Sequence, residues 1–186
     1  MTGKTHVLGG MGFALGGFMC LQSANMLIPD VSEPLQLSII LPYAIWASTF
    51  PDLDQDKDSM GKNNPIDLLF QKIFKVVGAK HRGAKSHVVP MFFTLVLYVA
   101  VAFSWIFNGM NGTEITIIGL ITMGLFLGLL SHFVLDCMTR QGVDCFGLTI
   151  RLVPNTDMFG TGTMYETIVR RIIYFIDCAL FIILFI

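Results

Sequence analysis

His132 and Asp136 are the two residues whose types and spacing most clearly suit chemistry. They lie four residues apart at the end of the apolar segment from Ile115 to Leu135. Side chains at that spacing share one face of an α-helix, so an imidazole and a carboxylate can hold a metal ion between them. Ionisable groups are costly in an apolar segment, which favours ion binding or catalysis over packing. Because such a pair also occurs by chance, other residues must support the prediction.

The other three histidines and two aspartates provide further candidate ligands, namely His6, Asp52, Asp54, His81 and His87. Each also has a structural interpretation: an interfacial anchor for His6, a helix cap and a loop charge for the aspartates, and a basic surface loop for His81 and His87. Together the potential ligands outnumber those of one tetrahedral zinc and suit one or two ions. Mixed histidine and carboxylate ligands fit zinc, manganese or iron better than calcium.

The composition is that of a membrane protein. Of 186 residues, 54% are hydrophobic and only 13% are charged, which is far from a soluble protein. The length predicts a single domain covering residues 1–186. The net charge of -1 provides no basic field for nucleic acid, so no nucleic-acid partner is expected.

Long apolar segments predict an all-α polytopic helical bundle with about four to five membrane-embedded helices. The segments are Val7 to Pro29, Leu35 to Phe50, Val88 to Phe107, Ile115 to Leu135 and Ile172 to Ile186. Between the second and third, residues 66–77 have apolar side chains at helical spacing with lysines among them. This pattern predicts an amphipathic helix on the cytoplasmic membrane surface.

The basic residues predict an orientation. All 12 lysines and arginines fall in the N-terminal segment or the two long polar segments, and the loops at 30–34 and 108–114 contain none. By the positive-inside rule, the N-terminus and both polar segments face the cytoplasm. That topology places all four histidines at one depth, so residues distant in the sequence could share a metal site.

Four sequence blocks carry a resemblance to a known family. They are Thr5-His6 before glycines, Pro51-Asp-Leu-Asp54, His81-Arg-Gly with Ser86-His87, and His132-Phe-Val-Leu-Asp136 with Thr139 and Gly142. In this order they resemble the YdjM-like family of bacterial inner-membrane proteins. Metal-dependent hydrolysis is inferred for that family because its pattern is similar to those of zinc-dependent phospholipase C and a related class of nucleases. The one departure is the separation of His81 and His87, which is six residues here and usually five in the family.

The resemblance implies a metal site, most simply for zinc, in the bacterial cytoplasmic membrane. Its ligands would be His6, Asp52, His81, His87, His132 and Asp136.

Such a site predicts hydrolysis of a phosphoester, for example a phospholipid, by metal-activated water. Asp54 is a candidate general base or bridging ligand, and Arg82 could bind phosphate oxygens, helped by Lys85 or Arg140. Membrane lipids are the expected partners, and the basic residues could instead bind anionic headgroups without catalysis. The alternative is a non-catalytic metal-binding membrane protein that recruits a cytoplasmic protein. A transporter is poorly supported, because Asp177 is the one carboxylate expected deep in the membrane.

Overall fold

The chain is mostly helical, as the sequence predicts. The computed structural model describes residues 1–24, 27–28, 31–54, 65–108 and 113–185. Its α-helices are α1 (Gly3–Ser23), α2 (Glu33–Ala47), α3 (Pro65–Val76), α4 (Ala84–Asn108), α5 (Thr113–Cys137) and α6 (Met164–Phe185). Two short 3-10 helices, η1 (Phe50–Asp54) and η2 (Asp157–Phe159), and two strands, β1 (Val143–Cys145) and β2 (Leu148–Ile150), complete the described elements.

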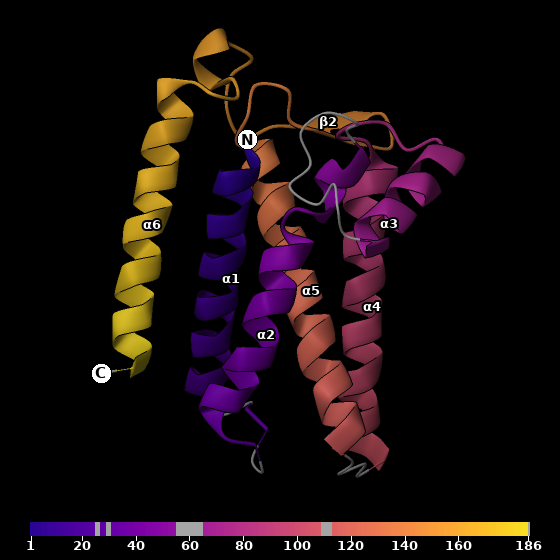
Figure 1. Cartoon of the computed structure of the whole chain (residues 1–186), viewed down its shortest axis with the longest axis vertical. Helices are drawn as coiled ribbons and strands as arrows, with labels where there is room; N and C mark the ends of the chain where they lie inside the picture. Colours follow the sequence, from indigo (N-terminus) through magenta and orange to yellow (C-terminus); the bar gives the residue numbers. More distant parts are fainter. Residues whose placement is uncertain (25–26, 29–30, 55–64, 109–112, 186) are drawn as a thin grey trace.

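Helix α5 lies at the centre of the bundle. It packs against α1, α2 and α4, while α6 packs against the outer side of α1. The largest buried cluster is apolar and includes Leu15, Phe18, Ile40 and Leu120. Figure 1 shows α1, α2, α4, α5 and α6 side by side, with α3 slanting beside one end of α4.

Two of the helices are long and apolar enough to cross a membrane. Among the described residues these are Ala84–Ser104 of α4 and Thr116–Cys137 of α5, which correspond to the predicted third and fourth apolar segments. Helix α6 begins at Met164, well before the apolar segment predicted from Ile172. It is therefore longer than the sequence pattern suggested.

The amphipathic helix predicted for residues 66–77 is α3. Its Phe74 is buried beside Phe50, and Trp46 donates a hydrogen bond from Nε1 to Asp67 Oδ1 at 3.1 Å. On its other side the apolar residues Leu69 and Val76 are exposed. One face of α3 thus attaches to the bundle and the other is exposed.

A short hairpin between α5 and α6 was not predicted. β1 and β2 pair antiparallel, with Val143 opposite Ile150, and Phe146 and Gly147 both have positive φ in the two-residue turn, as a tight hairpin requires. The backbone N–H of Asp144 donates to the carbonyl oxygen of Arg82 at 2.8 Å. The hairpin therefore holds the loop before α4 in place.

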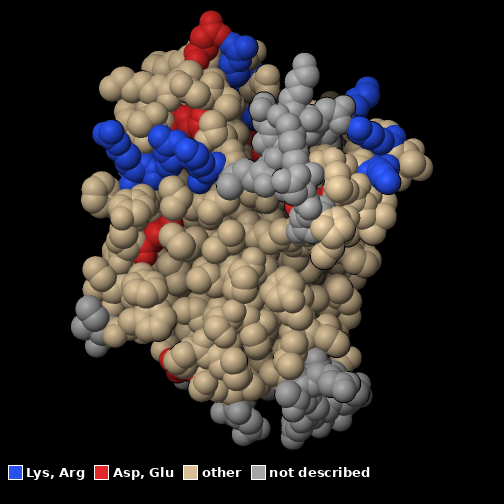
Figure 2. Space-filling view, viewed as in Figure 1, with Lys and Arg blue, Asp and Glu red and all other residues tan. Residues whose placement is uncertain are grey.

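The described parts of the two long polar segments lie at the end of the bundle where the N-terminus lies (Figure 1). The hairpin and α3 lie at this end (Figure 1). Figure 2 shows the Lys and Arg side chains of this face near the same end, above a largely uncharged surface. This arrangement agrees with the predicted clustering of basic residues on one side.

Gly128 sets the distance between α5 and α2. A Cβ atom there would lie 2.2 Å from the carbonyl oxygen of Ala44 and 2.8 Å from the Cβ of Ala47. Because backbone atoms cannot yield as a flexible side chain can, a larger residue would force the helices apart. The same stretch of α2 leads to Ser48, which contacts His132.

We predict that Gly128→Ala destabilises the protein by about 1–3 kcal/mol, the usual range for overpacking. Gly16→Ala is the matched control, because a Cβ there meets nothing within 4 Å, and alanine is the better helix former. Thermal unfolding of the detergent-purified variants measures both effects. Equal melting temperatures for the two variants would contradict the close contact.

Candidate metal centre

Five of the predicted ligands meet at one end of the bundle. His6 comes from the first turns of α1, Asp52 from η1 after α2, His87 from the start of α4, and His132 and Asp136 from the last turns of α5. Helices α1, α2, α4 and α5 alternate in direction. The starts of α1 and α4 and the ends of α2 and α5 therefore lie at the same end of the bundle (Figure 1). His6, His87, His132 and Asp136 are at most 1% exposed.

The carboxylate of Asp136 lies at the centre of the cluster. Its Oδ2 is 3.3 Å from His87 Nε2 and 3.5 Å from His132 Nε2. Its Oδ1 is 3.4 Å from His6 Nε2 and 2.9 Å from the amino group of Met1. Three imidazoles therefore direct the same ring nitrogen toward one carboxylate.

Asp52 forms the other side of the cluster. Its Oδ1 is 3.8 Å from His132 Nε2, and its Oδ2 is 3.9 Å from His6 Nε2. The rings of His6 and His132 stack at 3.8 Å between centroids. Unlike Asp136, the Asp52 side chain is partly accessible, at 18% exposure.

Neighbouring acceptors orient two of the imidazoles. The carbonyl oxygen of Ser48 accepts a hydrogen bond from His132 Nδ1 at 2.6 Å, so Nδ1 carries the proton and Nε2 has the free lone pair in the neutral ring. His87 Nδ1 is 2.9 Å from Ser86 Oγ, whose own proton faces backbone carbonyl oxygens. That arrangement again favours a free lone pair at Nε2.

These atoms fit a divalent metal ion. Two groups of ligand atoms each lie within 4.8 Å of one another: His6, Asp52 and His132, and His87, His132 and Asp136. Among the described residues, the buried Nε2 atoms of His6 and His132 have no hydrogen-bond partner. An imidazole lone pair repels a carboxylate oxygen that it faces unless a cation or a proton lies between them. Histidine and carboxylate side chains together are a usual ligand set for zinc and related metals.

Arg82 joins the cluster to the loop before α4. Its Nη2 is 3.3 Å from Asp136 Oδ1, and its Nη1 donates to Thr139 Oγ1. Thr139 in turn donates to the backbone carbonyl oxygen of Asp136 at 2.8 Å. Arg82 has a φ of 58°, which is uncommon for a residue other than glycine. The hydrogen bond to Thr139 and the ion pair with Asp136 thus hold the Arg82 side chain beside the cluster.

The other predicted site residues lie at the edge of the cluster, or their side chains are not among those that the structure describes. His81 is exposed and its ring lies 6.4 Å from that of His87, outside both groups of potential ligands. Asp54 ends η1, but its side chain is outside the described residues. Lys85 Nζ donates to the carbonyl oxygen of Val77 at 2.7 Å. Of the cations considered in the sequence, Arg82 is the one at Asp136.

Glu166 is a supporting residue that the sequence did not reveal. Its Oε1 accepts hydrogen bonds from the hydroxyl groups of Thr2 and Thr5, each at 2.7 Å, and its Oε2 accepts one from the Gly162 N–H at 2.6 Å. The start of α6 is thereby tied to the start of α1, next to His6. Burial alone would raise the pKa of Glu166, but these bonds and one from the Thr2 backbone lower its pKa to about 2.

The fold and the cluster together define a membrane protein with a candidate metal site. The chain belongs to the YdjM inner membrane protein family, whose model matches residues 1–157. This match confirms the resemblance seen in the sequence, and it covers all the predicted ligands. No curated protein and no solved structure matches the chain.

We predict that Glu166 stabilises the fold at neutral pH. Because its pKa is lowered in the folded protein, its contribution is complete above the ordinary value of 4.5 and is lost as the pH falls toward about 2. Glu166→Gln should cost about 1–3 kcal/mol at pH 7, since buried donors lose their charged acceptor. The difference from the wild type should shrink below pH 4.5.

Thermal unfolding from pH 7 down to pH 3 measures this effect. Glu33→Gln is the control, because Glu33 is exposed on α2, where it accepts a hydrogen bond from Gln22 Nε2. A Glu166→Gln protein as stable as the control at pH 7 would contradict the role assigned to Glu166.

Proposed function

We propose that the protein is a membrane-bound metal-dependent hydrolase that acts on a phosphoester, such as a phospholipid, at the cytoplasmic membrane surface. The convergence of three imidazole Nε2 atoms on the Asp136 carboxylate carries the proposal. Membership in an inner membrane family supports the location, but it assigns no reaction.

His6, Asp52, His87, His132 and Asp136 would hold one or two divalent ions, with zinc the first choice and manganese or iron the alternatives. When bound, such an ion supplies a Lewis acid that activates water for hydrolysis. His81, next to His87, would complete the ligand set or bind at its edge. Ser48 and Ser86 orient imidazoles from outside the cluster, as the outer partners of metal ligands do.

Two other residues would act on the substrate. Arg82 is a cation beside Asp136, where a guanidinium can bind phosphoryl oxygens and offset the charge that develops on them. Asp54, two residues after Asp52 in η1, is our candidate for the general base that accepts a proton from water.

The protein would cross the membrane four or five times, with its N-terminus and metal centre in the cytoplasm. Helices α1, α2, α4, α5 and α6 lie side by side (Figure 1), and α4 and α5 each contain a segment long and apolar enough to cross a membrane. The basic side chains on the face drawn in Figure 2 lie near the end that holds the cluster. The exposed apolar residues of α3 would contact the lipid interface. A site at this depth favours an amphipathic substrate.

A non-catalytic role is the second candidate, because the cluster is deeply buried. His6, His132 and Asp136 are 1% exposed or less, and a structural metal site has a closed shell whereas a catalytic one keeps an open position. In that case the metal would stabilise the end of the bundle, and the cytoplasmic face would bind a protein partner.

We predict that the chelator-treated protein regains hydrolysis of bis(p-nitrophenyl) phosphate or phosphatidylglycerol when zinc or manganese is added. Asp136→Asn should lower the rate by about 100-fold or more, because it removes the charge shared by three imidazoles. Glu33→Gln, the same kind of charge loss at an exposed site, should retain the wild-type rate. Metal-loaded protein with no hydrolysis of either substrate would favour the non-catalytic role.

A further inference from the structure

A polar pocket of about 350 Å³ is lined in part by Arg82, which also contacts Asp136 of the cluster. Three segments line it: the loop before α4, the residues after α5, and the segment from η2 to the start of α6. The lining residues are Arg82, Thr139, Arg140, Gln141, Asp157, Gly160, Thr161 and Thr163. Its volume is within the range of about 300–1,000 Å³ typical of small-molecule sites.

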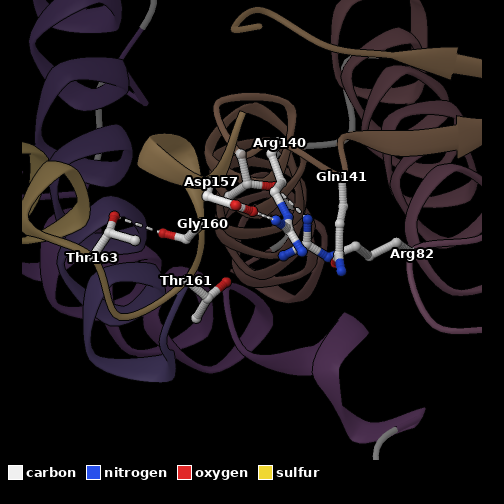
Figure 3. A pocket seen from close by; sticks show the side chains of 8 residues that line it. Arg82, Arg140, Gln141, Asp157, Gly160, Thr161 and Thr163 are labelled. Atoms are coloured by element: carbon white, nitrogen blue, oxygen red, sulfur yellow. Dashed lines mark hydrogen bonds and ion pairs between the residues drawn. The ribbon is translucent and has the colours of Figure 1, made fainter. Parts of the chain in front are cut away.

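The lining suits an anion. It contains two arginines and one carboxylate, and its other side chains are hydroxyl groups and one amide. Figure 3 shows Arg82, Arg140 and Gln141 extending toward the same region, with Thr161 across from them. Arg140 pairs with Asp157, and this pair is open to solvent, with side-chain exposures of 43% and 93%. Guanidinium groups bind phosphate with two parallel hydrogen bonds, and hydroxyl groups add further donors.

Arg82 connects this pocket with the cluster. It lines the pocket, is 8% exposed, and places Nη2 3.3 Å from Asp136 Oδ1. Among the described residues its buried Nε has no hydrogen-bond partner. A group bound against Arg82 would therefore lie one side chain away from the candidate metal ligands.

Hydrogen bonds keep the pocket walls together. The backbone N–H of Arg140 donates to the carbonyl oxygen of Phe159 at 3.0 Å, and Thr163 Oγ1 donates to the carbonyl oxygen of Gly160 at 2.8 Å. The segment after α5 is thus fixed against the η2 segment. A pocket organised before the ligand arrives loses less entropy on binding.

We infer that this pocket binds a phosphoryl group next to the metal centre. The inference rests on the proposed function, since it names the part of the substrate that Arg82 and Arg140 hold. The phosphoryl group belongs either to a lipid headgroup or to a soluble phosphate ester. A metal cation is disfavoured in the pocket by the two guanidinium groups.

Calorimetric titration of the chelator-treated, detergent-purified full chain tests the inference. The probes are inorganic phosphate and dihexanoyl phosphatidic acid, with dihexanoylglycerol as the lipid that lacks a phosphate. We expect saturable binding of at least one phosphate probe and none of dihexanoylglycerol. Binding of inorganic phosphate would show that the phosphoryl group suffices, and binding of phosphatidic acid alone would identify a lipid source.

Arg140→Gln should weaken phosphate binding about tenfold or more, because a charged hydrogen-bond donor is lost. Arg171→Gln, an exposed position of α6 outside the pocket lining, should bind as the wild type does. Thr161→Val is a smaller second change, with an expected loss of about threefold to fivefold, in case Arg140→Gln fails to fold.

Two results would contradict phosphoryl binding in the pocket. One is no saturable binding of either phosphate probe, and the other is equal binding by Arg140→Gln and Arg171→Gln. Metal content of the same proteins before chelation separates this inference from the proposed function. If the protein holds metal but binds no phosphate probe, the phosphoryl-binding pocket is contradicted and the metal centre stands. If it binds phosphate but holds no metal, the metal centre is contradicted and the pocket stands.

Discussion

The buried carboxylate of Asp136 is the constraint on which the rest of the site depends. A carboxylate that is 1% exposed is stable only when positive charge and hydrogen-bond donors surround it, because burying an unpaired charge costs several kcal/mol. Arg82 and the amino group of Met1 both contact Oδ1. Three imidazole nitrogens provide the remaining contacts, and these become strongly favourable when a metal ion joins them to the carboxylate.

The surrounding fold holds each partner of Asp136 separately. Close packing at Gly128 brings α2 to α5, so that the Ser48 carbonyl oxygen reaches His132. The hairpin fixes the backbone of Arg82, and Glu166 fixes the start of α1 near His6. The cluster is thus supported from several helices and from the hairpin-bound loop before α4, and such support is what holds the geometry of a metal or catalytic site.

The sequence predicted the long helices and the meeting of three of the four histidines, because apolar length and the distribution of basic residues are visible without a structure. His81, also predicted as a ligand, lies outside both groups of potential ligands. Spacing suggested His132 and Asp136, and topology supported them and added His6, Asp52 and His87. The hairpin was missed because its strands are three residues each, too short for a recognisable alternation. Glu166 was missed because its partners Thr2 and Thr5 are more than 160 residues away. That contact arises only from tertiary packing.

Elemental analysis of the detergent-purified protein tests the central claim most directly, with the wild type measured beside Asp136→Asn after gentle purification and after metal reloading. The account predicts roughly one to two equivalents of zinc or manganese in the wild type and a clear loss in the variant. A wild-type protein that holds no metal in either preparation would contradict it, as would an Asp136→Asn protein that retains the full amount.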